Sequence, residues 1–224
     1  MIQLENVRKR YISGHEALRG INLSINREEM LFLTGHSGAG KSTLLKLIAL
    51  LERPSSGKII FDEYDLALLN DKHIPYHRRR IGIIFQNPTL LEDQSVFANV
   101  ALPLQVSGYP EAEIQHRVNA SLDLVGLLDK AKRSPIVLSG GEQQRVGIAR
   151  AIVSRPEVIL ADEPTGNLDP ALSQDIMNLF IRLNQVGITL IIATHDLQLI
   201  NRFKHRQIEL KDGKIIPPHT GANT

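Results

Sequence analysis

The sequence contains no cysteine among its 224 residues. This absence excludes a disulfide framework and any metal site built on thiolates, and it is typical of a reducing compartment. Long apolar runs are also missing, because the longest, Leu44 to Leu51, is interrupted by Lys46 and falls short of the ~18 residues that a membrane span needs. Residues 1–10 lack the apolar core of a signal peptide. We therefore expect a cytoplasmic protein that contacts a membrane only through a partner.

Neither sign of charge dominates the chain. Lysine and arginine together number 26 and aspartate and glutamate 24, which gives a formal net charge of +2. Such a balance provides no broad electrostatic surface for nucleic acid. The cluster of Arg78, Arg79 and Arg80 is more typical of a solvated helix end than of a nucleic-acid patch. The length suits one sizeable α/β domain.

A glycine-rich loop is the most informative motif. The run from Gly35 to Ser42 fits G-x-x-x-x-G-K-[ST], with an apolar strand-like run before it and a helical segment after it. Glycines let backbone N–H groups turn toward phosphate oxygens, and the start of the helix adds its positive dipole end. Lys41 supplies a full charge for the β- and γ-phosphates, and the hydroxyl of Ser42 suits Mg²⁺. We expect the nucleotide to contact Gly35, His36, Ser37, Gly38, Ala39, Gly40, Lys41, Ser42 and Thr43.

Two acidic residues follow another apolar strand. Residues 158–161 are apolar and end in Asp162 and Glu163. Acids at the carboxyl end of a buried parallel strand lie where α/β folds bind ligands. Beside a phosphate loop, Asp162 is expected to complete the Mg²⁺ shell and Glu163 to position the attacking water. His195 follows the next apolar run, and by pattern alone it is better explained as an ordinary residue ahead of a helix that Asp196 caps.

A second anion cradle is predicted far from the first. Leu138 to Arg145 reads LSGGEQQR at a loop-to-helix junction, where the Ser139 hydroxyl and glycine amides are suited to an anion. A capped surface helix would explain the same spacing. We do not expect the two cradles of one chain to contact the same nucleotide. This favours two chains arranged head to tail, in which each nucleotide meets the other chain's Ser139, Gly140, Gly141 and Glu142.

The motifs together resemble those of the ATPase subunits of ABC transporters, over about residues 2–215. The resemblance implies an ATP-hydrolysing, Mg²⁺-dependent enzyme. It also implies that Tyr11 stacks on adenine, that Gln86 reaches Mg²⁺ and the catalytic water, and that Asp169 belongs to a loop, 167–169, that crosses to the partner chain. His195 is then the switch histidine at the γ-phosphate, which replaces the interpretation from pattern alone.

The same resemblance implies the fold. An α/β P-loop NTPase core of the RecA type is expected over residues 1–87 and 151–216, beginning with an antiparallel β subdomain. A helical subdomain is expected over residues 88–150, where the pattern already predicts helices near 111–126 and 141–153. The tail, 217–224, carries Pro, Gly and Thr and is expected to be disordered.

Longer stretches are similar to the cell-division subfamily of these ATPases. They are residues 32–47, 125–132 and 161–169, of which the last is shared with the LolD and MacB types. The chain departs from the subfamily pattern at Glu28-Glu29 and at Ala49-Leu50-Leu51, neither of which is expected to touch a phosphate. The subfamily implies a peripheral homodimer on the cytoplasmic face of the inner membrane. Its integral membrane subunit would dock near residues 87–104, and its output would be control of septal cell-wall hydrolases, with divisome contacts.

Two alternatives remain open at this point. A LolD- or MacB-type ATPase would release lipoproteins or expel substrates, and the residues of the ATP site do not separate it from the cell-division type. A soluble ABC ATPase acting on nucleic acid or ribosomes would need either a long coiled coil or a second phosphate loop, and the sequence has neither.

Overall fold

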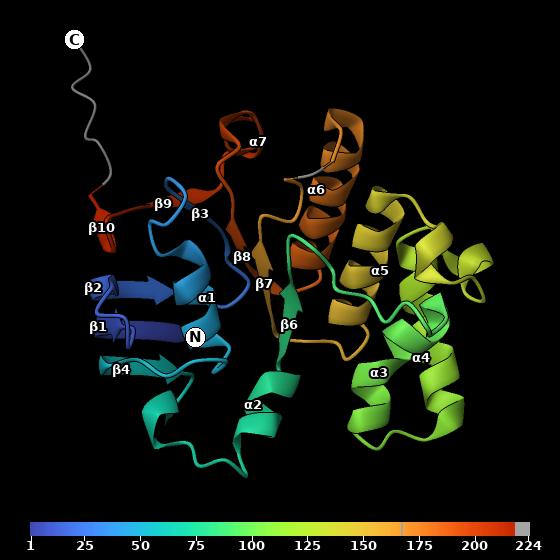
Figure 1. The fold of residues 1–224 in the computed structure, drawn as a ribbon, viewed down its shortest axis with the longest axis horizontal. Coiled ribbons are helices and arrows are strands. Elements are labelled where there is room, and N and C mark those ends of the chain that lie inside the picture. Colours follow the sequence, from blue (N-terminus) through green and yellow to red (C-terminus); the bar gives the residue numbers. More distant parts are fainter. Residues whose placement is uncertain (167, 218–224) are drawn as a thin grey trace.

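The computed structural model describes residues 1–166 and 168–217. Their strands form two sheets (Figure 1). The four-stranded sheet is antiparallel and has the spatial order β2 (Glu16–Ile25), β1 (Ile2–Arg10), β4 (Ser56–Phe61), β5 (Tyr64–Asp65). The six-stranded sheet has the order β10 (Lys214–Ile216), β9 (Arg206–Lys211), β3 (Met30–Thr34), β8 (Thr189–Ala193), β7 (Val158–Asp162), β6 (Ile81–Ile84). Asn167 and residues 218–224, for which the sequence predicts a partner-facing loop and a disordered tail, lie outside the described residues.

The six-stranded sheet is parallel except for β10, and both of its faces are covered. Side chains alternate between the faces of a strand. In β3, Phe32 therefore packs into the core shared with α5 (Gly140–Ile152) and α6 (Pro170–Gln185). Leu31 and Leu33 pack into a second core with α1 (Lys41–Ile48) and the antiparallel sheet. The prediction of a doubly covered parallel sheet is confirmed.

Three long helices fill the chain between β6 and β7. They are α3 (Val96–Val106), α4 (Glu111–Leu124) and α5, joined by 3₁₀ turns at η2 (Leu128–Lys130) and η3 (Pro135–Val137). Figure 1 places them, in green and yellow, at the end of the molecule away from the antiparallel sheet. Val100, Val118 and Val146 are fully buried in their shared core. The two helices predicted here begin and end within two residues of α4 and α5.

The remaining helical segments are short. They are η1 (Leu66–Leu68), α2 (Ile74–Arg79) and α7 (Leu197–Phe203), the last capped by Asp196 as expected. Arg78 and Arg80 of the basic cluster are engaged within the chain, Arg78 with the carbonyl oxygen of Leu50. None of the helices in the described part of the chain has the length and apolarity needed to span a bilayer.

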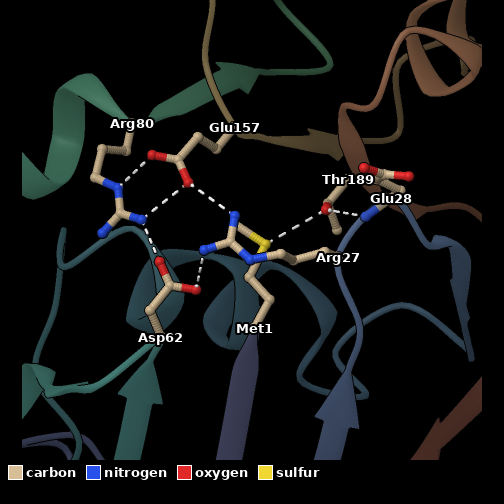
Figure 2. Close-up of polar contacts among 7 residues, drawn as sticks. All are labelled: Met1, Arg27, Glu28, Asp62, Arg80, Glu157 and Thr189. Carbon is tan, nitrogen blue, oxygen red and sulfur yellow. Dashed lines mark hydrogen bonds and ion pairs between the residues drawn. The ribbon is translucent and has the colours of Figure 1, made fainter.

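An ion-pair network ties the two sheets together at the amino ends of the parallel strands (Figure 2). Arg80, which directly precedes β6, donates to both carboxylate oxygens of Glu157 at 2.6 and 2.9 Å and to Asp62 of the β4–β5 turn. Arg27 pairs with Asp62 at 2.8 Å and with Glu157 at 3.5 Å. The Arg80 guanidinium also lies 4.6 Å from the centre of the Phe61 ring. These contacts fix the start of β6 relative to β7 and the antiparallel sheet.

Candidate active site

Most of the predicted site residues border a single cavity of about 540 Å³. They come from the carboxyl ends of β3, β6, β7 and β8, together with the turn after β1, and this edge of an α/β sheet is where ligands bind. The predicted residues among them are Tyr11, His36, Ser37, Gly38, Gly40, Lys41, Ser42, Thr43, Gln86, Asp162, Glu163 and His195. Gly35 and Ala39 support the loop without lining the cavity, Ala39 being 1% exposed.

The glycines of the loop are required by its backbone. Gly40, the N-cap of α1, has φ of +109°, and a Cβ there would lie 2.7 Å from the carbonyl oxygen of Ala17. At Gly35, with φ of +136°, a Cβ would clash with the carbonyl oxygen of Leu210. No other residue fits either position without moving a neighbouring strand. The loop is therefore shaped to wrap its amides around a phosphate group.

The amino end of α1 carries positive charge. Lys41 is 7% exposed, and its Nζ donates to the carbonyl oxygens of Gly35 at 2.7 Å and His36 at 3.3 Å. It also lies 3.7 Å from Oε1 of Glu163. The first turn of α1 carries no acidic residue that would offset the helix dipole. The His36 ring contacts the carbonyl oxygen of Ser37 at 2.7 Å, so it is held within its own loop.

Glu163 and His195 form a pair at the edge of the cavity. Strands β7 and β8 pair in parallel with Asp162 opposite Ala193, and this register brings the two side chains together. Oε2 of Glu163 lies 2.9 Å from Nδ1 of His195. Glu163 has φ of +48°, a strained backbone for a non-glycine residue, and its N–H donates to the carbonyl oxygen of Ala193 at 2.9 Å. His195 thus fixes the carboxylate of Glu163, and the bond to Ala193 fixes its backbone.

Tyr11 and Gln86 border the cavity at separate points. The Tyr11 hydroxyl lies 3.2 Å from Oγ1 of Thr43 and donates to Oε1 of Glu52, also at 3.2 Å. Gln86 follows β6, and its Nε2 approaches Gly166 so closely that a Cβ there would lie 3.2 Å away. His15, which belongs to none of the sequence motifs, also lines the cavity. No local signal identifies it, because it is brought there by the pairing of β1 with β2.

Oxygen donors suited to Mg²⁺ border the same cavity. They are the Ser42 hydroxyl, the Gln86 amide oxygen and the Asp162 carboxylate. Among residues 1–166 and 168–217, no three His, Cys, Asp or Glu side chains are grouped as a metal site. Mg²⁺ keeps several waters and takes few protein ligands, so this small set of hard oxygen donors fits it.

The second cradle does not border the cavity. Ser139 is exposed and caps α5, where its Oγ accepts from the Glu142 N–H at 3.3 Å and the Glu142 carboxylate accepts from the Ser139 N–H at 2.9 Å. The Lys130 ammonium beside this carboxylate and the Ser139 N–H lower the pKa of Glu142 to about 2. Lys130 also offsets the negative charge of Glu142, which would otherwise repel an anion at the helix start.

Asp169 also lies apart from the cavity and caps α6 by accepting from the Leu172 N–H at 3.0 Å. Of the predicted site residues, Ser139, Gly140, Gly141, Glu142 and Asp169 thus remain away from the phosphate loop of their own chain.

Comparisons with known proteins show the family of the chain. Residues 18–166 match a family model described as ABC transporter. Over 215 residues, 96% of this chain and 97% of the relative, the sequence is 56% identical to the cell division ATP-binding protein FtsE of Escherichia coli K12. It is 46% identical over 216 residues to the protein of the same name from Bacillus subtilis 168, covering 96% and 95% of the two chains.

Solved structures give the same picture. A dimeric structure of a post-hydrolysis state of the ATP-binding cassette MJ0796, bound to ADP and Pi, superimposes with a TM-score of 0.89 at 38% identity over 97% of each chain. A second dimeric structure of MJ0796, described as a bacterial ABC transporter cassette, superimposes with a TM-score of 0.89 at 39% identity, again over 97% of each chain.

Proposed function

The chain belongs to the ABC transporter family, and we propose that two copies of it enclose ATP between them and drive a membrane complex that acts in cell division. It is an ATP-binding and ATP-hydrolysing subunit with the fold of the ABC ATPase cassette. The observation that carries the proposal is the separation of two anion cradles. One surrounds Lys41 in the cavity, and the other, at Ser139, opens to solvent.

Within one chain, the cavity residues bind and orient the nucleotide. The loop amides and Lys41 hold the β- and γ-phosphates. Among the described residues, the Lys41 ammonium contacts the carbonyl oxygens of Gly35 and His36 and the carboxylate of Glu163. Tyr11 stacks on the adenine. Ser42, Gln86 and Asp162 would hold Mg²⁺, which supplies positive charge to the phosphate oxygens when bound.

Hydrolysis relies on the Glu163 and His195 pair. Glu163 accepts a proton from, or orients, the attacking water, and the 2.9 Å contact with His195 keeps its carboxylate aimed from the end of β7. His195 is mostly exposed, which leaves its ring accessible, and in the proposal it also contacts the γ-phosphate. Because the His195 side chain is 68% exposed, a second chain is needed to exclude bulk water from the pair.

The second chain provides the remaining contacts. Its Ser139, Gly140, Gly141 and Glu142 close over the γ-phosphate, and its loop at Asp169 lies beside the interface. A separate hollow of about 530 Å³, lined by Glu163 and His195 together with Leu168 and Ser173, adjoins the catalytic pair. Its position supports an approach of a partner chain along the start of α6. ATP contacts made only in the closed dimer supply the differential affinity that such a switch requires.

The cell-division role follows the full-length similarity to FtsE. We propose that the chain works on the cytoplasmic face of the inner membrane with an FtsX-type integral membrane subunit. Exposed apolar side chains between the end of β6 and α3 support docking in this segment, since Phe85, Leu91 and Leu102 are 41%, 43% and 37% exposed. ATP-driven closure would then control septal peptidoglycan hydrolases outside the membrane, with further divisome contacts.

The Glu163→Gln variant tests the enzymatic part. Removing the carboxylate leaves the phosphate contacts of Lys41 in place, so ATP binding persists while turnover falls by about 10²-fold or more. With ATP and Mg²⁺ the variant is expected to elute as a dimer in size-exclusion chromatography, and without ATP as a monomer. Unchanged turnover would contradict the role of Glu163.

The partner is tested separately, by extraction of the native membrane in mild detergent and capture of the chain. A co-purifying protein with four membrane spans and a large external domain is expected. Recovery of a lipoprotein-release or efflux subunit in its place would refute the cell-division assignment and leave the ATPase assignment intact.

A further inference from the structure

The helix that begins at Ser139 is bonded to the segment that carries Gln86. Gln144 of α5 is only 3% exposed, and its Nε2 donates a 3.1 Å hydrogen bond to the carbonyl oxygen of Phe85. Phe85 directly precedes Gln86. A buried side-chain amide therefore fixes the backbone on the amino side of Gln86, where an unpaired carbonyl would be costly.

Two further residues of α5 hold the backbone on the carboxyl side of Gln86. Arg150 donates to the carbonyl oxygens of Pro88 and Thr89, the second at 3.3 Å. Between the two polar side chains, Gly147 lets the helix approach so closely that a Cβ there would lie 2.8 Å from Cβ of Pro88. The spacing of three residues between 144, 147 and 150 places all of these contacts on one face of the helix.

Strand β6 ends two residues before Gln86 and is held at both of its ends. It lies at the edge of the six-stranded sheet and pairs with β7 alone. Its start is fixed by Arg80, which Figure 2 shows bonded to Glu157 and Asp62. Its far end is attached to α5 through Gln144. Helix α5 also packs on the middle of the strand, where a Cβ at Gly82 would lie 2.5 Å from the carbonyl oxygen of Ala151, so β6 and the segment with Gln86 are both in contact with α5.

We infer that Gln144 and Arg150 are positioning residues that tie the placement of Gln86 to the placement of Ser139. The inference rests on the proposed function, in which Ser139 grips the ATP of the partner chain and Gln86 serves the ATP of its own chain. When Ser139 engages the second nucleotide, α5 carries residues 85–89 with it and sets Gln86 relative to Asp162. Each chain thereby connects the two nucleotide sites of the dimer.

A double-mutant cycle on turnover tests this link in the full-length chain. Gln144→Met keeps the size of the side chain and removes its donor, and we expect kcat to fall about tenfold with KM for ATP unchanged, since misplacing a catalytic group costs rate more than binding. If Gln144 acts through Gln86, the Gln86→Ala, Gln144→Met double variant is no slower than Gln86→Ala alone. Unchanged kcat in Gln144→Met, or losses that multiply, would overturn the inference.

Matched variants separate positioning from general loss of stability. Asn184→Leu removes two side-chain amide hydrogen bonds, one more than Gln144→Met, to the carbonyl oxygens of Glu28 at 2.8 Å and Ile188 at 2.9 Å, away from the cavity. We expect it to leave the kcat of wild-type and of Gln86→Ala chains unchanged. Arg150→Gln, at a half-buried position, tests the link even if Gln144→Met misfolds. If the wild-type chain hydrolyses ATP and the losses of kcat in the two single variants multiply in the double variant, only this inference is refuted. If the wild-type chain does not hydrolyse ATP, the proposed function is refuted as well.

Discussion

At the scale of single residues, Gly40 shows how the phosphate loop depends on a backbone that other residues avoid. Gly40→Ala adds a Cβ that meets the carbonyl oxygen of Ala17 at 2.7 Å and a side-chain carbon of Leu18 at 2.8 Å, at φ of +109°. The strain of about 1–3 kcal/mol displaces the loop amides. We expect affinity for ATP, measured with a fluorescent analogue, to fall about tenfold or more.

Gly108→Ala is the matched control for that prediction. Gly108 also has a positive φ, +76°, but an added Cβ there meets no atom within 4 Å, and the residue lies in the turn between α3 and α4. It is expected to lower stability and leave ATP affinity unchanged. Equal losses of affinity in both variants would show that the shape of the phosphate loop is not the cause.

Glu142 gives a pH-dependent prediction. Lys130 and the Ser139 N–H hold its pKa near 2, against an ordinary value of 4.5. A carboxyl whose pKa is lower in the folded chain stabilises the fold above its ordinary pKa, and this contribution is lost as pH falls toward the folded value. Urea unfolding should therefore show wild type more stable than Glu142→Gln at pH 6, with the difference shrinking below about pH 4.5. A difference that stays constant down to pH 3 would contradict the Lys130 and Ser139 contacts.

His195 marks the limit of prediction at this scale. Its neighbours in the sequence, Thr194 and Asp196, indicate only a strand end and a helix cap. Its contact with Glu163 depends on the pairing of β7 with β8, which joins residues 32 positions apart. The phosphate loop needed no such information, because its glycines, Lys41 and Ser42 are consecutive.

At the scale of elements, the network around Arg80 is the clearest target. Arg80→Met leaves the carboxylates of Asp62 and Glu157, 16% and 39% exposed, without their main partner. We expect the free energy of unfolding to fall by about 1–3 kcal/mol, because half-buried carboxylates lose charge-assisted hydrogen bonds. Arg80→Lys is expected to lower the free energy of unfolding by a smaller amount, because lysine keeps the charge but does not form the bidentate contact.

Arg27→Met is the internal control for the same network. Its guanidinium is 60% exposed, so its removal is expected to cost no more than about 1 kcal/mol. Urea unfolding of all four proteins at one salt concentration makes the comparison. A loss for Arg27→Met as large as for Arg80→Met would contradict the assignment of Arg80 as the centre of the network.

Elements with a clear period were predictable, and those without one were not. Helix α6 has clear signals at both ends, because a capping Asp169 precedes Pro170 and Gly187 follows soon after Gln185. Helix α3 escaped prediction: it is apolar on nearly every side and contains Pro103. The antiparallel subdomain came from the family resemblance, since the pairing of β1 with β4 joins distant segments.

At the scale of the whole molecule, the proposed function requires that each ATP is held by two chains. Within one chain, the cavity around Lys41 has a phosphate cradle, oxygen donors for Mg²⁺ and the Glu163–His195 pair, yet it remains open. Ser139 has an accessible hydroxyl and helix start, yet its own chain places no phosphate loop there. Each half supplies what the other lacks, and this complementarity predicts the head-to-tail arrangement.

The lack of cysteine makes that arrangement directly measurable, because any introduced thiol is unique. In the Glu163→Gln background, one preparation would carry Ser37→Cys and another Ser139→Cys, both positions being exposed. Mixed with ATP and Mg²⁺ and treated with a short thiol-specific cross-linker, they are predicted to form a covalent pair joining 37 to 139, which is absent without ATP and from either preparation alone. A mixture that binds ATP but stays monomeric, or that cross-links 139 to 139, would contradict the binding of each ATP by two chains.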